Sequence, residues 1–446
     1  MIALLNSTLG WRPRTPFYYG WLILVMCALA TFAATGVSQI TLGGIQVFIT
    51  DDTGWKKSTL SLAVSAGTWS SGLLSPLIGR LTDRHGPRWL MPVGIVIAAI
   101  SFFSLSGVGA VWQFFAAYIL GRAVTNPVLI GVVPRAATVN FFHRRRNIAL
   151  ALVSTFRPIG GAINIQIMSL IAIRYGWRAA YRYLGVLSLL LVAPIVLLMR
   201  RRPEDIGLLP DGASQREPWP AGPRDVGTGG AGRRMGVRKA EFSWTAREAS
   251  RTRAFWLVVM TTACGGLASS TVSFSLVPYL AEDVGVSKGQ AAGVLSLSIF
   301  LAISNLGWGY LADLVTPRRC LAMAMVGAGA MVFYLTTVGS LPMAFGFALL
   351  FGIFSGPGGS LESMVLAQYF GRTSYGTILG MFVPFQMVML GLGPTLGSVF
   401  REVVGPYTNL YLALAGVYFM AGLFIFLARP PALPARAVAE SGVQAE

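Results

Sequence analysis

The stretch GRLTDRHGPR, residues 79–88, lies between two apolar runs and recurs in altered form later in the chain. Its counterpart is GYLADLVTPR, residues 309–318. Two other pairs keep nearly the same separation along the chain: GWKKSTLS at 54–61 with GVSKGQAA at 285–292, and Phe141 with Tyr369. A nearly constant separation over three landmarks indicates an internal repeat, so we expect two related halves.

The remainder of the chain is strongly apolar. Of its 446 residues, 54% are hydrophobic and 12% are charged, and the mean hydropathy is +0.64. Apolar runs long enough to cross a bilayer as a helix, which takes about 20 residues, recur throughout. They cover residues 18–37, 58–78, 88–107, 111–139, 147–173, 179–199, 254–280, 288–311, 320–339, 342–367, 374–400 and 407–428. Since unpaired backbone groups are costly in hydrocarbon, the sequence predicts an all-α membrane protein with 12 transmembrane helices in two pseudo-symmetric six-helix bundles.

A change of composition divides these runs into two groups of six. Between the two groups the chain becomes rich in Pro, Gly and Arg, which is typical of a linker rather than a packed span. We therefore predict an N-terminal six-helix bundle at 1–200, a cytoplasmic linker at 201–252 and a C-terminal six-helix bundle at 253–430. Residues 431–446 are expected to form a disordered cytoplasmic tail.

Lys and Arg are distributed unevenly among the predicted loops. With the N-terminus in the cytoplasm, 25 of the 35 lie on the inner side and 7 on the outer side. This excess places both termini in the cytoplasm of a multi-pass cell-membrane protein, taken as a bacterial cytoplasmic membrane protein and a monomer. The net charge of +18 comes mainly from the inner loops and would attract anionic membrane lipid, so no nucleic-acid partner is needed.

Residue types that carry enzyme or metal chemistry are sparse. Cys27, Cys264 and Cys320 fall in or beside apolar runs without a CxxC spacing, and His85 and His143 lie in basic turns. No phosphate loop, catalytic triad or cluster of metal ligands is recognisable. The sequence therefore predicts no enzyme, no catalytic residue, no cofactor and no metal site, and a gradient has to drive any uphill transport.

Two six-helix repeats joined by a basic connector are typical of a transporter whose solute site lies between the halves. GRLTDRHGPR resembles the loop signature of the major facilitator superfamily, and the resemblance covers almost the whole chain. Within that superfamily, FYYGW at 17–21, FFHRRRNIALAL at 141–152 and YFGRTSYGTILG at 369–380 are similar to the bacterial monocarboxylate and oxalate/formate porter group. The resemblance implies a secondary transporter that works by alternating access.

In that superfamily the loop signature latches one conformation of the transport cycle. Glycines permit a tight turn, an aspartate can sit at a helix N-terminus, and arginines suit carboxylates or helix C-termini. The alternative is ordinary turn and topology chemistry. The residues that the resemblance assigns to the conformational latch are Gly79, Asp83, Arg84, Gly86, Arg88 and Asp313.

Charged residues inside the apolar runs mark the candidate transport site, because a charge at the bilayer centre costs roughly 2.5–3.5 kcal/mol on the insertion scale. Arg157 lies near the middle of the run 147–173 and shares a helical face with Ser154, Gly160 and Asn164. Its guanidinium can grip a substrate carboxylate with two hydrogen bonds, or it can pair with a carboxylate of the other half. Both interpretations stay open at this point.

Glu362 is the carboxyl within the run 342–367. Three roles are open to it: binding and releasing a proton during transport, a permanent ion pair with Arg157 or Arg135, or contact with cytoplasmic water. Its charge is opposite to that of the embedded arginines, which favours an ion pair. Its position within an apolar run favours the protonated carboxyl, which suits proton coupling.

Two further arginines lie in the fourth run. On an ideal helix Arg122 and Arg135 point about 140 degrees apart, so both face one cavity only if Pro127 or Pro134 distorts the helix. Asn305 stands where monocarboxylate relatives carry an arginine, and it offers a neutral hydrogen-bonding contact instead. The candidate substrate-binding residues are Arg157, Arg122, Asn126, Asn305, Gln39, Gln46 and Gln386.

Three embedded arginines against one embedded glutamate favour an anionic substrate. The leading hypothesis is a secondary transporter of a small organic anion, a monocarboxylate by resemblance, moved with a proton or exchanged for a counter-anion. One alternative is a proton-antiporting exporter of amphiphilic or drug-like compounds. Another is a sensor that binds solute without moving it.

Overall fold

The computed structural model describes residues 16–209, 211, 244–403 and 406–431. Within these residues the chain forms helices and no strand, which confirms the all-α class. The side chains of a few helical residues, Gln39 and Gln46 among them, lie outside the described part. Residues 212–243 of the predicted linker and the predicted tail from residue 432 also lie outside it.

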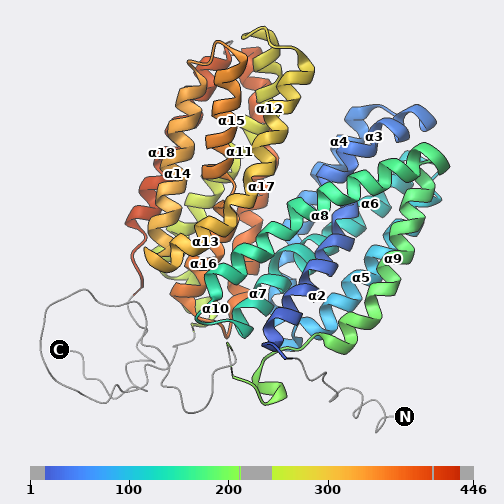
Figure 1. Ribbon diagram of the computed structural model, residues 1–446, viewed down its shortest axis with the longest axis vertical. Helices are drawn as coiled ribbons and strands as arrows, with labels where there is room; N and C mark the ends of the chain where they lie inside the picture. Colours follow the sequence, from blue (N-terminus) through green and yellow to red (C-terminus); the bar gives the residue numbers. More distant parts are fainter. Residues whose placement is uncertain (1–15, 210, 212–243, 404–405, 432–446) are drawn as a thin grey trace, which may run out of the picture.

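The helices form two bundles that lie side by side (Figure 1). The first bundle contains α2 (Tyr19–Ala34), α3 (Gln39–Thr53), α4 (Lys57–His85), α5 (Pro87–Ser106), α6 (Val111–Thr125), α7 (Val132–Phe141), α8 (Arg146–Tyr175) and α9 (Trp177–Leu198). The second contains α11 (Arg253–Glu282), α12 (Lys288–Phe300), α13 (Asn305–Leu314), α14 (Pro317–Leu335), α15 (Leu341–Ser355), α16 (Gly358–Phe370), α17 (Tyr375–Val403) and α18 (Tyr407–Leu427). A short helix, α10 (Ala246–Ser250), precedes α11.

Eleven helical stretches of the described chain are long and apolar enough to cross a membrane. The remaining long helix is α4, which has 29 residues and is rich in Ser, Thr and Gly. The Ser, Thr and Gly residues lower the hydropathy of α4. They suit its packing along α17 of the other bundle, because small residues allow the two helices to approach closely. With α4 included, the architecture agrees with the predicted twelve transmembrane helices.

Several spans are interrupted near their middle. The first span breaks at Ser38, whose extended backbone separates α2 and the short turn Thr35–Val37 from α3. The fourth contains a π-helical segment, Asn126–Gly131, between α6 and α7. The tenth turns at Gly356 and Pro357, between α15 and α16. Interrupted helices free backbone groups and redirect side chains at the depth where a solute site is expected.

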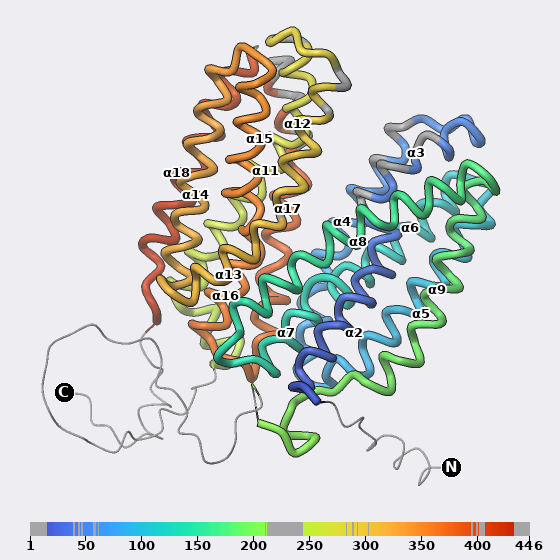
Figure 2. Tube along the Cα trace, in the orientation of Figure 1, coloured from blue at the N-terminus to red at the C-terminus, as the bar shows by residue number. Residues whose placement is uncertain are grey.

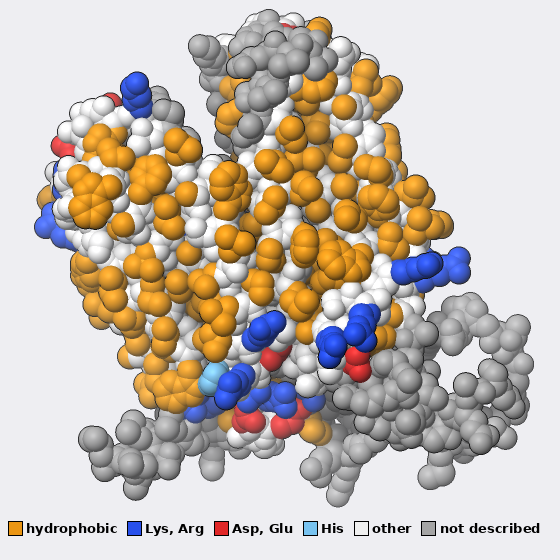
Figure 3. Space-filling view, turned by 180° about the vertical axis from the view of Figure 1, so that it is seen from behind, with side chains coloured by type: hydrophobic (Ala, Val, Ile, Leu, Met, Phe, Trp, Pro, Cys, Tyr) orange, Lys and Arg blue, Asp and Glu red, His pale blue; other side chains and the backbone are white. Residues whose placement is uncertain are grey.

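The bundles meet at one end and diverge at the other, as the Cα trace in Figure 2 shows. Lys and Arg side chains gather at the end where they meet, whereas the surface above it is mostly hydrophobic (Figure 3). We call this end the basic end; it carries the connections at Gly86, 142–145, 315–316 and 371–374. At the opposite end Figure 3 shows a notch between the two bundles.

Glycines hold the two bundles close together at the basic end, along α4 and α17. A Cβ added to Gly380 would lie 2.5 Å from the carbonyl oxygen of Ser75, and one added to Gly79 would lie 3.1 Å from the Cα of Gly380. The Gly79 Cβ would also penetrate the carbonyl oxygen of Gly376. Backbones this close leave no room for any side chain, so the seam depends on glycine at these positions.

Candidate functional site

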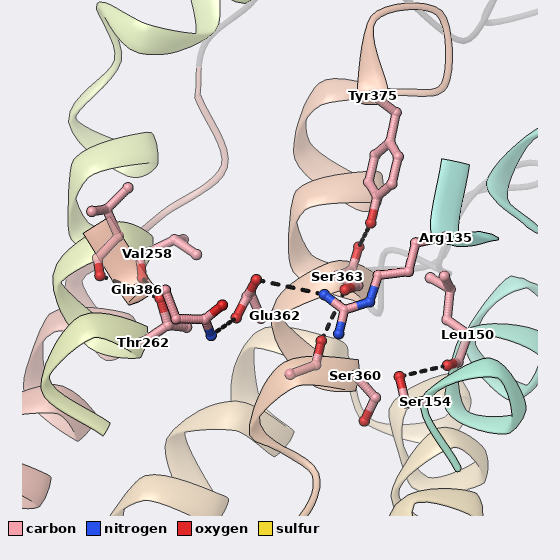
Figure 4. Close-up of polar contacts among 12 residues, drawn as sticks. Arg135, Leu150, Ser154, Val258, Thr262, Ser360, Glu362, Ser363, Tyr375 and Gln386 are labelled. Atoms are coloured by element: carbon pink, nitrogen blue, oxygen red, sulfur yellow. Dashed lines mark hydrogen bonds and ion pairs between the residues drawn. The ribbon is translucent and has the colours of Figure 1, made fainter. Parts of the chain in front are cut away.

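Arg135 and Glu362 face each other across the interface between the bundles (Figure 4). Arg135 comes from α7 of the first bundle, and Glu362 comes from α16 of the second. The Nη1 atom of Arg135 lies 4.0 Å from Oε1 of Glu362, and the glutamate side chain is fully buried. The structure thus brings Arg135, rather than Arg157, to Glu362. Oε1 has no hydrogen-bond partner among the described residues, so the pair is an electrostatic contact without a hydrogen bond.

The other oxygen of Glu362 is held within its own bundle. The Nε2 atom of Gln386, on α17, donates a hydrogen bond of 2.9 Å to Oε2 (Figure 4). Gln386 was predicted as a substrate-binding residue, and the structure places it beside the candidate proton site. Its contact with a substrate stays a prediction.

Arg157 lies in the middle of α8 without an acceptor among the described residues. Its Nε is buried, and no side chain or carbonyl in this part of the chain accepts a hydrogen bond from it. The positive charges of Arg122 and Arg135 lie close enough to Arg157 to interact with it. Arg157 is partly buried, and no carboxylate among the described residues pairs with it; we call Arg122, Arg135 and Arg157 the arginine cluster.

The π-helical segment lies between Arg122 and Arg135, both of which act electrostatically on Arg157. Asn126 and Pro127 begin this segment, and its wider turn changes the rotation between the two arginines relative to an ideal helix. The sequence identified Pro127 as one of two residues that could distort the helix. The structure places the distortion there.

Arg122 is more deeply enclosed than Arg157. It is 3% exposed, and its Nη1 reaches the carbonyl oxygen of Val37 at 3.5 Å, next to the break in the first span. Asn126 donates to the hydroxyl of Ser71 at 3.1 Å. Both side chains therefore bond within the first bundle, and substrate contact remains a prediction for them. Gln39 and Gln46 lie on α3, but their side chains are outside the described part.

Asn305, which has a predicted role, and Asn164, which shares the Arg157 face, both bond within their own bundles. Asn305 accepts a hydrogen bond of 2.7 Å from the Ser360 hydroxyl, and it is buried. Asn164, which shares the Arg157 face, donates to the Thr35 hydroxyl at 2.7 Å. These bonds tie α13 to α16 and α8 to the first span, and the substrate contact predicted for Asn305 stays a prediction.

Asp83 joins the two bundles at the basic end. Its Oδ1 accepts the backbone N–H of Gly376 at 3.0 Å, and its Oδ2 accepts that of Thr377 at 2.7 Å. These N–H groups belong to the first turn of α17, where the helix dipole favours a negative charge. The geometry is that of a carboxylate cap crossing from one bundle to the other.

The other residues of the predicted latch are placed differently. Gly86 has a φ of 78°, and a Cβ there would meet the side chain of Arg201, which also donates to the carbonyl of Asp83. Arg84 is exposed, and the Arg88 guanidinium lies over the ring of Trp89 at 5.9 Å. Their part in a conformational latch stays a prediction.

Asp313 is the repeat counterpart of Asp83 at the seam between α13 and α8. It is exposed, and its Oδ1 accepts one hydrogen bond of 2.7 Å from the side-chain amide of Asn147. Gly309, one turn earlier, faces the Ala151 side chain, where an added Cβ would lie 2.7 Å away. This seam therefore lacks the backbone cap that Asp83 forms.

Sequence reasoning missed the arginines that close the basic end around these seams. Arg146 donates to the carbonyl of Ala367 at 3.2 Å, and Arg372 donates to that of Asn140 at 3.4 Å. Each arginine reaches the last turn of a helix in the opposite bundle, where a cation is favoured. Arg372 also pairs with Glu204 at 2.7 Å. The repeat pairing of the two loops was the signal that could have identified this contact.

The arrangement is chemically suited to the binding of an anion between the two bundles. Within the described residues no group of three or more His, Cys, Asp or Glu could hold a metal ion. The positive side chains of the cluster come from α6, α7 and α8, and the single negative one comes from α16. A solute that entered between the bundles would meet a positive first bundle and a carboxyl on the second.

Comparisons with known proteins identify the family of the chain. The model of the Major Facilitator Superfamily matches residues 27–276 and 258–445. The chain is 25% identical to Monocarboxylate transporter 12 of Homo sapiens, over 92% of this chain and 80% of the relative. It is 26% identical to the agnestins efflux protein AgnL12 of Paecilomyces divaricatus, over 92% of this chain and 87% of that protein.

A solved structure has the same fold. The transporter FucP, described in its outward conformation, superposes with a TM-score of 0.69 at 15% sequence identity and covers 92% of this chain and 99% of its own. The two-bundle architecture, the repeated loop stretches and the family match over most of the sequence lead to one conclusion: the chain belongs to the Major Facilitator Superfamily.

Proposed function

We propose that this transporter moves a small organic anion, of the monocarboxylate class, across the cell membrane by alternating access. The observation that carries the proposal is the arginine cluster, in which Arg157 has no acceptor among the described residues. A carboxylate would supply the missing acceptor through two hydrogen bonds to one guanidinium. The similarity to proteins named monocarboxylate transporters supports this class of substrate.

The direction of opening follows from the placement of the charges. With the basic end in the cytoplasm, both termini are cytoplasmic, and the notch between the bundles faces outward. The arginine cluster would then be approached from outside and released inward after the contacts at Asp83, Arg146 and Arg372 separate. Glu362 is the candidate for coupling, either by taking up a proton or by remaining paired with Arg135 while anions are exchanged.

Export of an amphiphilic compound is a second candidate function, favoured by the similarity to an efflux protein. In that case apolar contacts would hold the solute, and Arg135 would serve mainly to pair with Glu362. Loss of Arg157 would then leave transport largely intact. The two functions thus make opposite predictions for one residue.

Uptake of a panel of labelled carboxylates into proteoliposomes tests the proposal, with and without an inward proton gradient. We expect saturable uptake by the wild type and a loss of at least about tenfold in Arg157→Gln, since a charged hydrogen-bond partner contributes about 1.5–3 kcal/mol. Arg174→Gln is the matched control, because Arg174 lies on the same helix but is exposed.

Three outcomes separate the candidates. Uptake lost in Arg157→Gln and kept in Arg174→Gln supports an anion porter with Arg157 at its site. Equal uptake by both variants contradicts the role of Arg157. Absence of carboxylate uptake by folded wild type overturns the substrate class, and proton-driven export of amphiphilic dyes then becomes the measurement to make.

A further inference from the structure

The two carboxylate oxygens of Glu362 have different surroundings. Oε2 accepts the 2.9 Å hydrogen bond from Gln386, whereas Oε1 lies 4.0 Å from Arg135 with no hydrogen-bond partner among the described residues. Figure 4 shows Gln386 and Arg135 on opposite sides of the carboxylate. The carboxylate is therefore hydrogen-bonded at Oε2, whereas Oε1 is buried without a hydrogen bond from the described residues.

These two neighbours also belong to different moving parts. Gln386 lies on α17 and Glu362 on α16, which pack together in the second bundle, whereas Arg135 lies on α7 of the first. When the bundles move apart, the contact with Gln386 travels with Glu362, and the contact with Arg135 does not. The hydrogen bond from Gln386 is therefore the constant part of this environment during alternating access.

The packing around Gln386 leaves room for this orientation. A Cβ added to Gly266 of α11 would lie 3.9 Å from Cγ of Gln386, so the glutamine lies beside a helix surface without a side chain at that point. The neighbouring hydroxyl of Thr262 bonds to carbonyls of its own helix, Val258 at 3.1 Å and Val259 at 3.2 Å. Thr262 therefore does not compete for Glu362.

We propose that Gln386 is a positioning residue: it fixes Oε2 of Glu362, keeps Oε1 directed at the first bundle, and so sets the pH at which this carboxyl exchanges a proton. The inference rests on the proposed coupling role of Glu362. It assigns Gln386 an action through Glu362 rather than a contact with the solute. An amide N–H donated to a carboxylate stabilises the charged form, so its loss favours the protonated one.

Other charged and titratable groups near Glu362 are few. Arg135 on α7 and Tyr375 on α17 interact with it electrostatically, and Arg157 on α8 acts on Arg135. From α11, α13 and α14, the described residues bring no charged group to bear on Glu362. With the bundles closed at the basic end, a change at Gln386 therefore affects one carboxyl and one ion pair.

The test is a titration of the Glu362 carboxyl band by infrared difference spectroscopy in reconstituted full-length protein, assigned by its loss in Glu362→Gln. Gln386→Met keeps the length of the side chain and removes the donor. We expect the midpoint of the band to move to higher pH by about one pH unit, because a hydrogen bond to a charged group is lost. Thr262→Val is the control and should leave the midpoint unchanged.

The titration requires no transport, so its result is independent of the substrate. A shifted midpoint in Gln386→Met supports the inference even if no carboxylate is taken up, in which case only the proposed function fails. An unchanged midpoint, or a shift of the same size in Thr262→Val, overturns it. Absence of a titrating Glu362 band in the wild type overturns it as well. Where uptake is measurable, the pH of half-maximal uptake should move in the same direction as the band.

Discussion

The two seams between the bundles arise from the same repeat, but they are built differently. At α4 and α17, glycines from both helices let the backbones touch, and Asp83 accepts two backbone N–H groups of the opposite bundle. At α13 and α8, a Cβ added to Gly309 would lie 2.7 Å from the Ala151 side chain and no nearer than 3.2 Å to the backbone of α8, and Asp313 accepts one side-chain amide at the surface. The comparison teaches that a repeated motif preserves the turn, whereas the partner of its aspartate determines whether the turn binds the backbone of the opposite bundle.

Adding a methyl group at the first seam should have the largest effect. In Gly79→Ala the Cβ meets the backbone of Gly376 and Gly380, neither of which can yield as a side chain does. We expect the basic end to open and uptake to fall at least tenfold. Spin labels at residues 85 and 319, one in each bundle, would report a longer and broader distance distribution.

The comparison breaks if Gly309→Ala opens the basic end as far as Gly79→Ala does. Gly307→Ala is the neutral reference, because a Cβ at Gly307 would have no atom within 4 Å. A change in Gly307→Ala would indicate that the assay reports general disturbance of the helix rather than the seam.

Removing the carboxylates should have the next largest effect. Asp83→Ala leaves two N–H groups of α17 without an acceptor, which costs about 1–3 kcal/mol in the closed basic end. Asp313→Ala removes one exposed hydrogen bond and should cost less than about 1 kcal/mol. A cysteine placed at residue 75 could be labelled with a membrane-impermeant thiol reagent applied from the basic end. The rate of labelling would measure, for each variant, the fraction of molecules whose basic end is open. Equal labelling in both variants would contradict the proposed difference.

A smaller effect is expected from the ion pair beside the first seam. Glu204→Gln removes the partner of Arg372, and because both side chains are about one third exposed we expect about 0.2–1 kcal/mol, decreasing as salt is added. Asp205→Asn is the matched control on the same short turn, where Asp205 accepts a local N–H from Arg202 and has no ion-pair partner among the described residues. The distance between the spin labels at residues 85 and 319, measured at low and high salt, would show whether Glu204 helps to keep the basic end closed.

The smallest effect should come from a carboxylate that does not cross the seam. Asp52 accepts hydrogen bonds from Trp177 and Arg178 within the first bundle, and these hold the pKa of Asp52 below its usual range. Its contribution to stability is complete above about pH 4 and is lost as the pH falls through the lowered pKa. Thermal unfolding of wild type and Asp52→Asn should therefore differ slightly at pH 7 and converge in acid, while the basic-end distance is unchanged in both.

Much of the fold could be predicted because it follows from hydropathy and a repeat. The span of α4 was identified as the apolar run 58–78 even though its Ser, Thr and Gly content makes it the least apolar of the long helices. The breaks in the helices were only partly predictable. Pro127 pointed to one distortion. Ser38 caps the N-terminus of α3 by accepting the backbone N–H of Thr41, and although serine is a common N-cap residue, a single serine within an apolar run did not predict a break.

The candidate site was predicted as a set of residues but not as a set of pairs. Embedded charges identify themselves by their cost in the membrane, which is how Arg157, Arg135 and Glu362 were found. Which arginine lies near Glu362 depends on how two bundles dock, and a single sequence does not contain that geometry. For the same reason Gln386 was assigned to the substrate, although its amide donates to Glu362.

The interruptions of the fourth and tenth spans have a consequence for ancestry. Pro127 and Pro357 are separated along the chain by the same interval as Gly79 and Gly309, so the two interruptions occupy equivalent places in the two halves. Arg135 and Glu362 do not: valines, Val365 and Val132, stand at their counterparts. The simplest history is that a six-helix ancestor already carried the bent helix before it was duplicated. The charges then arose separately in each copy, as the duplicated halves diverged into partners.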